Sequence, residues 1–181
     1  MKKSTILILG FLGLALIDSL IGFIFPIDFS FIEHSIVPHF CFIGTLIYVY
    51  DKEGFTRLLI GSLVGLMLDM LFTMTFPVDV FLFGMASYAI GFFAKWMQQS
   101  KMKYLIVLMF AFLYDGIPYV WSRMVNLDYA TFGLWFLKFE MFTIGLNFAT
   151  VLFLNYIKEV MSRFFLIRQH RKKNKRKPAR V

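Results

Sequence analysis

Three aspartates stand inside long apolar stretches of the sequence. They are Asp18 in "ALIDSLIG", Asp69 in "LLIGSLVGLMLDMLF" and Asp115 in "LYDGIPYVW". A carboxylate at the centre of a bilayer costs about 2.5 to 3.5 kcal/mol on insertion scales, so each is expected to face protein or a water-filled cavity rather than lipid. These three residues are therefore the first candidates for a polar site.

Asp69 is preceded by glycines at a regular spacing. Gly61, Gly65, Asp69 and Thr73 follow one another every four residues, which gives a stripe that turns by only about 40° per step around a helix. Glycines on such a stripe let a second helix approach closely. We predict a seam here, with three uses left open: packing in which Asp69 caps or hydrogen-bonds a neighbouring helix, binding of a partner protein, or binding of an ion or solute.

The elements that carry these residues must cross a membrane. Hydrophobic residues make up 59% of the 181-residue chain and charged residues 17%, with a mean hydropathy of +0.71, which excludes an ordinary soluble domain. A bilayer core of about 30 Å needs roughly 20 apolar residues per helix. The sequence therefore predicts an all-α, polytopic membrane protein, a compact bundle of about six transmembrane helices, near residues 5–25, 31–50, 56–76, 78–97, 103–122 and 132–157.

The positive charges indicate the orientation of this bundle. Of the 19 lysines and arginines, all but Arg123 and Lys138 fall on one side of the predicted membrane. Because cytoplasmic loops are enriched in Lys and Arg, both termini are expected in the cytoplasm. The chain then divides into a six-helix transmembrane domain, residues 1–158, and a basic cytoplasmic tail, residues 159–181.

The tail is expected to contact anionic lipid headgroups or the acidic surface of a partner. A nucleic-acid ligand is not expected, because the basic segment has no aromatic residues for stacking on bases. The basic residues proposed for the contact are Arg168, Arg171, Lys172, Lys173, Lys175, Arg176, Lys177 and Arg180.

The three aspartates are expected at one depth in the bilayer. Their helices all run from inside to outside, and each aspartate lies 13 or 14 residues into its predicted span. Like charges at one level repel, so at least one should be protonated or paired with a polar partner. We predict a polar pocket open to the outside, with three unrelated helix-end contacts as the alternative. The candidate pocket residues are Asp18, Asp69, Asp115, Arg123 and Glu140.

No catalytic set emerges from the sequence. It contains no HExxH or CxxC motif, no phosphate-cradling glycine loop and no plausible Ser, His and Asp grouping. Cys41 is the single cysteine, which excludes an intramolecular disulfide and a cysteine-based metal cluster. We expect a protein that is not an enzyme and that uses no metal or cofactor.

Residues 61–93, "GSLVGLMLDMLFTMTFPVDVFLFGMASYAIGFF", resemble the rod shape-determining protein MreD family. The resemblance rests on a glycine-rich helix ending in an aspartate, then a turn, then Gly84, Tyr88 and Gly91 in the next helix. Members often have a proline and an acidic residue at the start of the second apolar helix, where this chain has Pro38 and His39.

This resemblance implies a membrane scaffold of the bacterial cell-elongation machinery. Such a scaffold lies in the cytoplasmic membrane, binds MreC, acts beside MreB, RodA and a class B penicillin-binding protein, and controls cell shape and peripheral peptidoglycan synthesis. The family also resembles, in fold, the substrate-binding subunits of energy-coupling-factor transporters. That likeness supplies the alternative function, a solute-binding subunit for a vitamin-type ligand whose pocket is lined by Asp69, Asp115 and Glu140.

Overall fold

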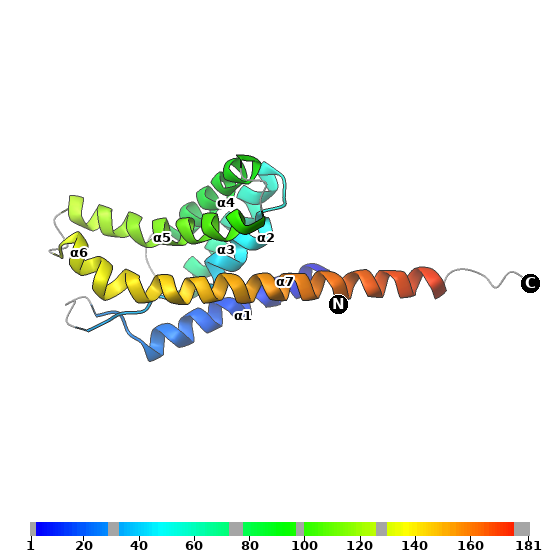
Figure 1. Cartoon of the computed structure of the whole chain (residues 1–181), viewed down its shortest axis with the longest axis horizontal. Helices are drawn as coiled ribbons and strands as arrows, with labels where there is room; N and C mark the ends of the chain where they lie inside the picture. Colours follow the sequence, from blue (N-terminus) through cyan, green and yellow to red (C-terminus); the bar gives the residue numbers. More distant parts are fainter. Residues whose placement is uncertain (1–2, 29–32, 73–77, 97–99, 126–129, 176–181) are drawn as a thin grey trace, which may run out of the picture.

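The computed structural model describes residues 3–28, 33–72, 78–96, 100–125 and 130–175, and within these ranges it is helical with no strands (Figure 1). This confirms the all-α class. Residues 132–175 form one uninterrupted helical stretch, in which two α-helices are joined by a π-helix. The elements are α1 (Lys3–Ile24), α2 (Phe40–Val49), α3 (Gly54–Phe72), α4 (Val78–Trp96), α5 (Ser100–Met124), α6 (Phe132–Trp135), the π-helix η1 (Phe136–Glu140) and α7 (Met141–Lys175).

Four helical stretches among the described residues are long and apolar enough to cross a membrane. They are Thr5–Ile24, Gly54–Phe72, Met102–Met124 and Phe132–Phe164. Two further apolar helices, Phe40–Val49 and Val78–Ala94, are shorter. The chain is therefore a helical membrane protein, as its composition predicts.

The second predicted span, residues 31–50, is wrong in its outer half. Residues 33–39 are not helical, and α2 has only 10 residues, which is about 15 Å of helix and half of a bilayer core. Pro38 explains where the helix begins. A proline disfavours helical backbone in the residue before it, so α2 begins two residues after Pro38.

The short helix α2 forms the centre of the core and contacts α1, α3, α4, α5 and α7. Packing of this kind, rather than a hydrophobic driving force, holds helices together in lipid. Its buried residues come from all sides of the helix and are Cys41, Phe42, Ile43, Thr45, Leu46, Ile47 and Val49.

The first helix is packed less closely than the other long helices, and the last helix extends beyond the bundle (Figure 1). Only 11% of the most apolar part of α1 is buried, and among the described helices its main contact is α2. Figure 1 shows α7 extending well past the rest of the bundle toward the C-terminus. The helix passes the expected domain boundary at residue 158 and ends at Lys175, so the first part of the basic segment continues the last span as a helix. Arg176, Lys177 and Arg180 lie outside the described residues.

Candidate functional site

The glycine stripe of α3 packs against α4. A Cβ atom at Gly61 would meet the Phe83 carbonyl oxygen and the Ser87 side chain, and one at Gly65 would meet the backbone of Asp79. The two helices are therefore in contact through their backbones, as small residues permit. Thr73, the last residue of the predicted stripe, lies outside the described residues.

Asp69 caps the N-terminus of α4. Its Oδ1 accepts a hydrogen bond from the Asp79 N–H at 3.2 Å, and its Oδ2 accepts one from the Val80 N–H at 2.9 Å. The first N–H groups of a helix have no partner within the helix and form the positive end of its dipole. The seam thus lies inside the chain, with α4 covering the face that carries Asp69.

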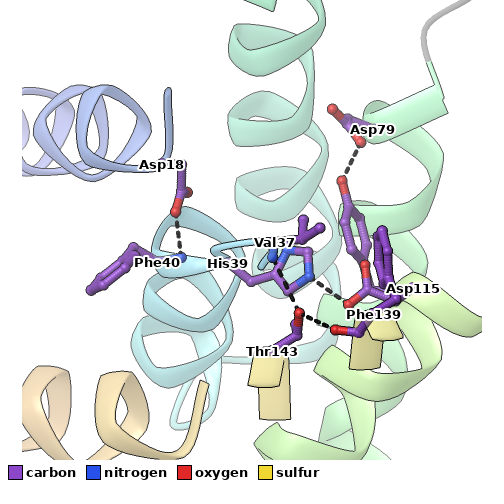
Figure 2. A network of polar contacts seen from close by, with 9 residues as sticks. Asp18, Val37, His39, Phe40, Asp79, Asp115, Phe139 and Thr143 are labelled. Atoms are coloured by element: carbon purple, nitrogen blue, oxygen red, sulfur yellow. Dashed lines mark hydrogen bonds and ion pairs between the residues drawn. The ribbon is translucent and has the colours of Figure 1, made fainter. Parts of the chain in front are cut away.

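Asp18 of α1 caps the N-terminus of the short helix α2 in the same way. Its two carboxylate oxygens accept hydrogen bonds from the N–H groups of Phe40 at 2.7 Å and Cys41 at 2.8 Å. Figure 2 shows Asp18 reaching from α1 toward Phe40 at the start of α2. Because α2 begins inside the bundle, this cap replaces the water that would satisfy an exposed helix end.

The other end of α2 is held by a base. Lys158 of α7 donates hydrogen bonds to the Ile47 carbonyl at 3.0 Å and to Asp51 Oδ2 at 2.8 Å. The hydrogen bond from Lys158, reinforced by its charge and those of Lys103 and Lys52, lowers the pKa of Asp51 below its usual value. An acid at the N-terminus and a base at the C-terminus both match the dipole of α2.

The non-helical segment before α2 is held by the last helix. The Ser35 N–H donates to the Lys138 carbonyl at 2.9 Å, and the Val37 N–H donates to Thr143 Oγ1 at 3.1 Å. The Thr143 hydroxyl in turn donates to the Phe139 carbonyl at 2.8 Å. Lys138 and Phe139 belong to the π-helix η1, where the wider turn changes the pairing of carbonyls. Irregular backbone at membrane depth requires such partners.

A buried polar cluster joins three helices. His39 Nε2 and Asp115 Oδ2 form a hydrogen-bonded pair at 2.7 Å, with side chains that are 5% and 7% exposed. Figure 2 shows His39, at the start of α2, facing Asp115 of α5. Glu140 of η1 lies beside Asp115 and is fully buried, and neither of its oxygens has a hydrogen-bond partner among the described residues.

A cavity of about 440 Å³ is lined in part by His39, and its lining residues do not include Asp115 or Glu140. Asp18, His39, Asp79 and Tyr114 supply its polar lining, and Phe42 and Phe83 are among its apolar walls. The Tyr114 hydroxyl donates to Asp79 Oδ1 at 2.6 Å. The cavity thus combines two carboxylates with aromatic rings, a lining that suits a positively charged group more than an anion.

The structure brings together only part of the predicted pocket. Asp18 lines the cavity, and Asp115 with Glu140 lies behind His39. Asp69 is not in the cavity lining. Arg123 is exposed, and its guanidinium donates to the Ala130 carbonyl at 3.1 Å.

His39, Asp79 and Tyr114 belong to the site, although the sequence analysis did not select them. His39 had a usable signal, since it lies well inside the apolar run 31–50, at a depth comparable with the three aspartates. Tyr114 had none, because a tyrosine in an apolar helix is ordinary. Among the described residues, no three His, Cys, Asp or Glu side chains are grouped so that they could hold a metal ion.

The fold and the buried polar groups define a class, a helical membrane protein whose central half-helix is capped by side chains of its neighbours. Beyond that class, comparison gives no assignment. No protein-family model, no curated protein and no solved structure matches the chain.

Proposed function

We propose that this protein is a non-enzymatic scaffold in the bacterial cytoplasmic membrane, with both termini in the cytoplasm. It binds the membrane anchors of cell-elongation proteins, MreC first, and acts beside MreB, RodA and a class B penicillin-binding protein to control cell shape and peripheral peptidoglycan synthesis. The family resemblance of residues 61–93 supplies the partners. The exposed face of α1 supplies the physical basis for binding a partner helix.

One side of α1 offers an open docking face, and this observation carries the proposal. A Cβ atom at Gly10 or Gly13 would meet none of the described atoms within 4 Å, so none of the described helices uses these glycines for close approach. They are surrounded by exposed apolar side chains at helical spacing, namely Leu9, Leu16, Ile17 and Leu20. Small residues flanked by apolar ones are typical of helix association in lipid, so the face suits one transmembrane helix of a partner.

The test is a pair of matched double variants. Gly10→Leu with Gly13→Leu adds bulk where a partner helix would approach, and neither side chain would meet the chain's own atoms at Cβ. The control is Gly133→Leu with Gly145→Leu. A Cβ atom at these glycines would also have open space around it, but they belong to α6 and α7 rather than α1. We expect loss of MreC co-purification and of rod shape in the first variant only. Wild-type co-purification and shape in both would contradict the docking face.

The basic segment supports a second contact of the same scaffold. The helix α7 continues beyond the apolar stretch that ends at Phe164 and carries the basic residues Arg168, Arg171, Lys172, Lys173 and Lys175. Each basic residue near an anionic surface contributes about 1 kcal/mol to binding. We propose that this segment lies against anionic lipids on the cytoplasmic side, close to the partner filament.

The cavity beside His39 favours a second candidate function, a solute-binding subunit of an energy-coupling-factor transporter. Its volume of about 440 Å³ lies in the range of small-molecule sites, and a half-helix beside a cavity is a feature of transporter sites. Asp18 and Asp79 would select a ligand with a cationic group. Depletion separates the two functions: misshapen cells with normal uptake indicate the scaffold, and normal shape with lost uptake of a vitamin-type solute indicates the transporter.

A further inference from the structure

A second hollow of about 430 Å³ lies at the end of α3 opposite Asp69. It opens between the start of α3 and the last turns of α4, on the side where the charge asymmetry predicts the cytoplasm. Its charged residues are Lys52, Glu53 and Arg57, and its wall is formed by Tyr88, Gly91 and Phe92.

Arg57 is the notable group in this hollow. Its Nε atom is buried without a hydrogen-bond partner, and the ion pairs found among the described residues do not include it. Arg57 as a whole is half-buried. Carboxylate or phosphate oxygens are the best partners for a guanidinium that has no counter-ion.

Gly91 makes the room that Arg57 occupies. The position of a Cβ atom on Gly91 is already taken by the Arg57 guanidinium, so the arginine lies directly on the backbone of α4. Gly91 is also one of the residues that carry the family resemblance. The absence of a side chain at Gly91 therefore leaves room for the Arg57 guanidinium in the hollow.

We infer that this hollow binds a phosphate group, held by Arg57 with Lys52 beside it. Lys52 stands over the Tyr48 ring, 5.2 Å from its centroid, and the start of α3 at Gly54 adds the positive end of a helix dipole. Glu53 is exposed and opposes only one of the two cations. The lining is thus net positive.

The walls identify the source of the phosphate as a lipid headgroup. Tyr88 and Phe92 are 45% and 59% exposed, and their rings pack edge to face at 5.3 Å. They extend the hollow along an exposed apolar side of α4, which acyl chains would cover in a bilayer. An anionic phospholipid such as phosphatidylglycerol would place its phosphate on Arg57 and its chains against these two rings.

The experiment titrates the purified full-length protein with phosphatidylglycerol and counts bound lipid by native mass spectrometry. Arg57→Gln should bind about fivefold more weakly than wild type, the equivalent of about 1 kcal/mol for one basic residue. The matched control is Arg163→Gln, which removes the same charge from an exposed position on α7 outside the hollow and should keep the wild-type affinity. Diacylglycerol, which has acyl chains but no phosphate, should bind all three proteins equally.

A second variant keeps the positive charge of Arg57 but moves its guanidinium. Gly91→Ala displaces the flexible guanidinium, so it should reproduce the loss seen in Arg57→Gln with the net charge unaltered. If inorganic phosphate competes with the lipid in wild type but not in Arg57→Gln, the phosphate is confirmed as the recognised group and solution is a second source. Wild-type lipid binding in both Arg57→Gln and Gly91→Ala would overturn the inference.

Discussion

Asp18 and Lys158 hold opposite ends of the same helix, although they belong to α1 and α7. Asp18 accepts from the first N–H groups of α2, and Lys158 donates to the Ile47 carbonyl near its end. Each charge faces the end of the helix dipole that it stabilises. This pair allows a helix of 10 residues, too short to span a bilayer, to stand at the centre of the bundle.

Removal of the Asp18 cap should destabilise the protein in a graded way. Asp18→Ala leaves two N–H groups without their acceptors and should lower the free energy of unfolding by about 2 kcal/mol, whereas Asp18→Asn, which keeps one oxygen, should lose about half of that. Thermal unfolding in detergent measures both. Ser19→Ala, at the exposed neighbouring residue, should be neutral, and equal stability of all three variants would show that Asp18 does not cap α2.

The seam between α3 and α4 should tolerate no added methyl group. Gly65→Ala would place a Cβ against the backbone of Asp79, which cannot rotate away as a side chain could, so we expect a loss of about 1 to 3 kcal/mol. Gly10→Ala serves as the control, because the open space around Gly10 leaves only the small gain that Ala has over Gly in a helix. A wild-type unfolding temperature for Gly65→Ala would contradict the close approach.

The pair of His39 and Asp115 should show strong coupling in a double-mutant cycle. Breaking a buried pair from one side costs about 3 to 5 kcal/mol, whereas replacing both partners by apolar residues is often close to neutral. We therefore expect His39→Leu to be strongly destabilising and the double variant His39→Leu with Asp115→Leu to recover much of the loss. Additive losses in unfolding experiments would rule out the pair.

Glu140 should accept an amide without penalty. Its oxygens have no hydrogen-bond partner among the described residues, and it lies beside Asp115, so Glu140→Gln keeps the shape and places no second negative charge beside Asp115. We expect a change within about 1 kcal/mol of wild type, whereas Glu140→Ala leaves a cavity and should cost about 2 kcal/mol or more. Comparable destabilisation by Gln and Ala would instead show that the carboxylate itself is required.

Asp51 should make a small, pH-dependent contribution. Its pKa is lowered in the folded protein by the hydrogen bond from Lys158, so the contribution is fully present above the pKa of the unfolded chain and is lost as pH falls through the lower, folded value. The Asp51 side chain is 57% exposed, which limits the contribution to about 1 kcal/mol or less. Asp51→Asn should lower the unfolding temperature slightly at pH 7, and the difference from wild type should vanish in acid.

The sequence predicts the long helices and the aspartate-bearing faces because both follow from local pattern. An apolar run of sufficient length has no stable alternative to a helix in lipid, and the four-residue spacing of Gly61, Gly65 and Asp69 defines one face wherever that helix packs. The identity of the covering helix, α4, required only that neighbours along the chain pack together.

The shape of the second span could not be predicted in this way. Residues 33–39 read as apolar helix. Pro38 marks where α2 can begin, but the non-helical backbone before it is stable because the Lys138 carbonyl and Thr143 Oγ1 accept its hydrogen bonds. These partners lie a hundred residues away in the sequence. His39 is likewise 76 residues from its partner Asp115 along the chain. Counting residues along each span predicted a similar depth in the bilayer for Asp18, Asp69 and Asp115. Which carboxylates meet depends on where their helices lie in the plane of the membrane, and that count does not give it.

The attachment of α2 to α7 has a consequence for how the chain is made. Lys158 is 111 residues from Ile47, and Thr143 is 106 residues from Val37, so neither contact exists while the first half of the protein leaves the ribosome. Until α7 is made, the nascent chain has the Asp18 cap at one end of α2 and lacks the Lys158 contact at the other. Assembly in the membrane therefore finishes from the C-terminal side, and a polypeptide released early would expose the unsatisfied backbone of residues 33–39 to quality-control proteases.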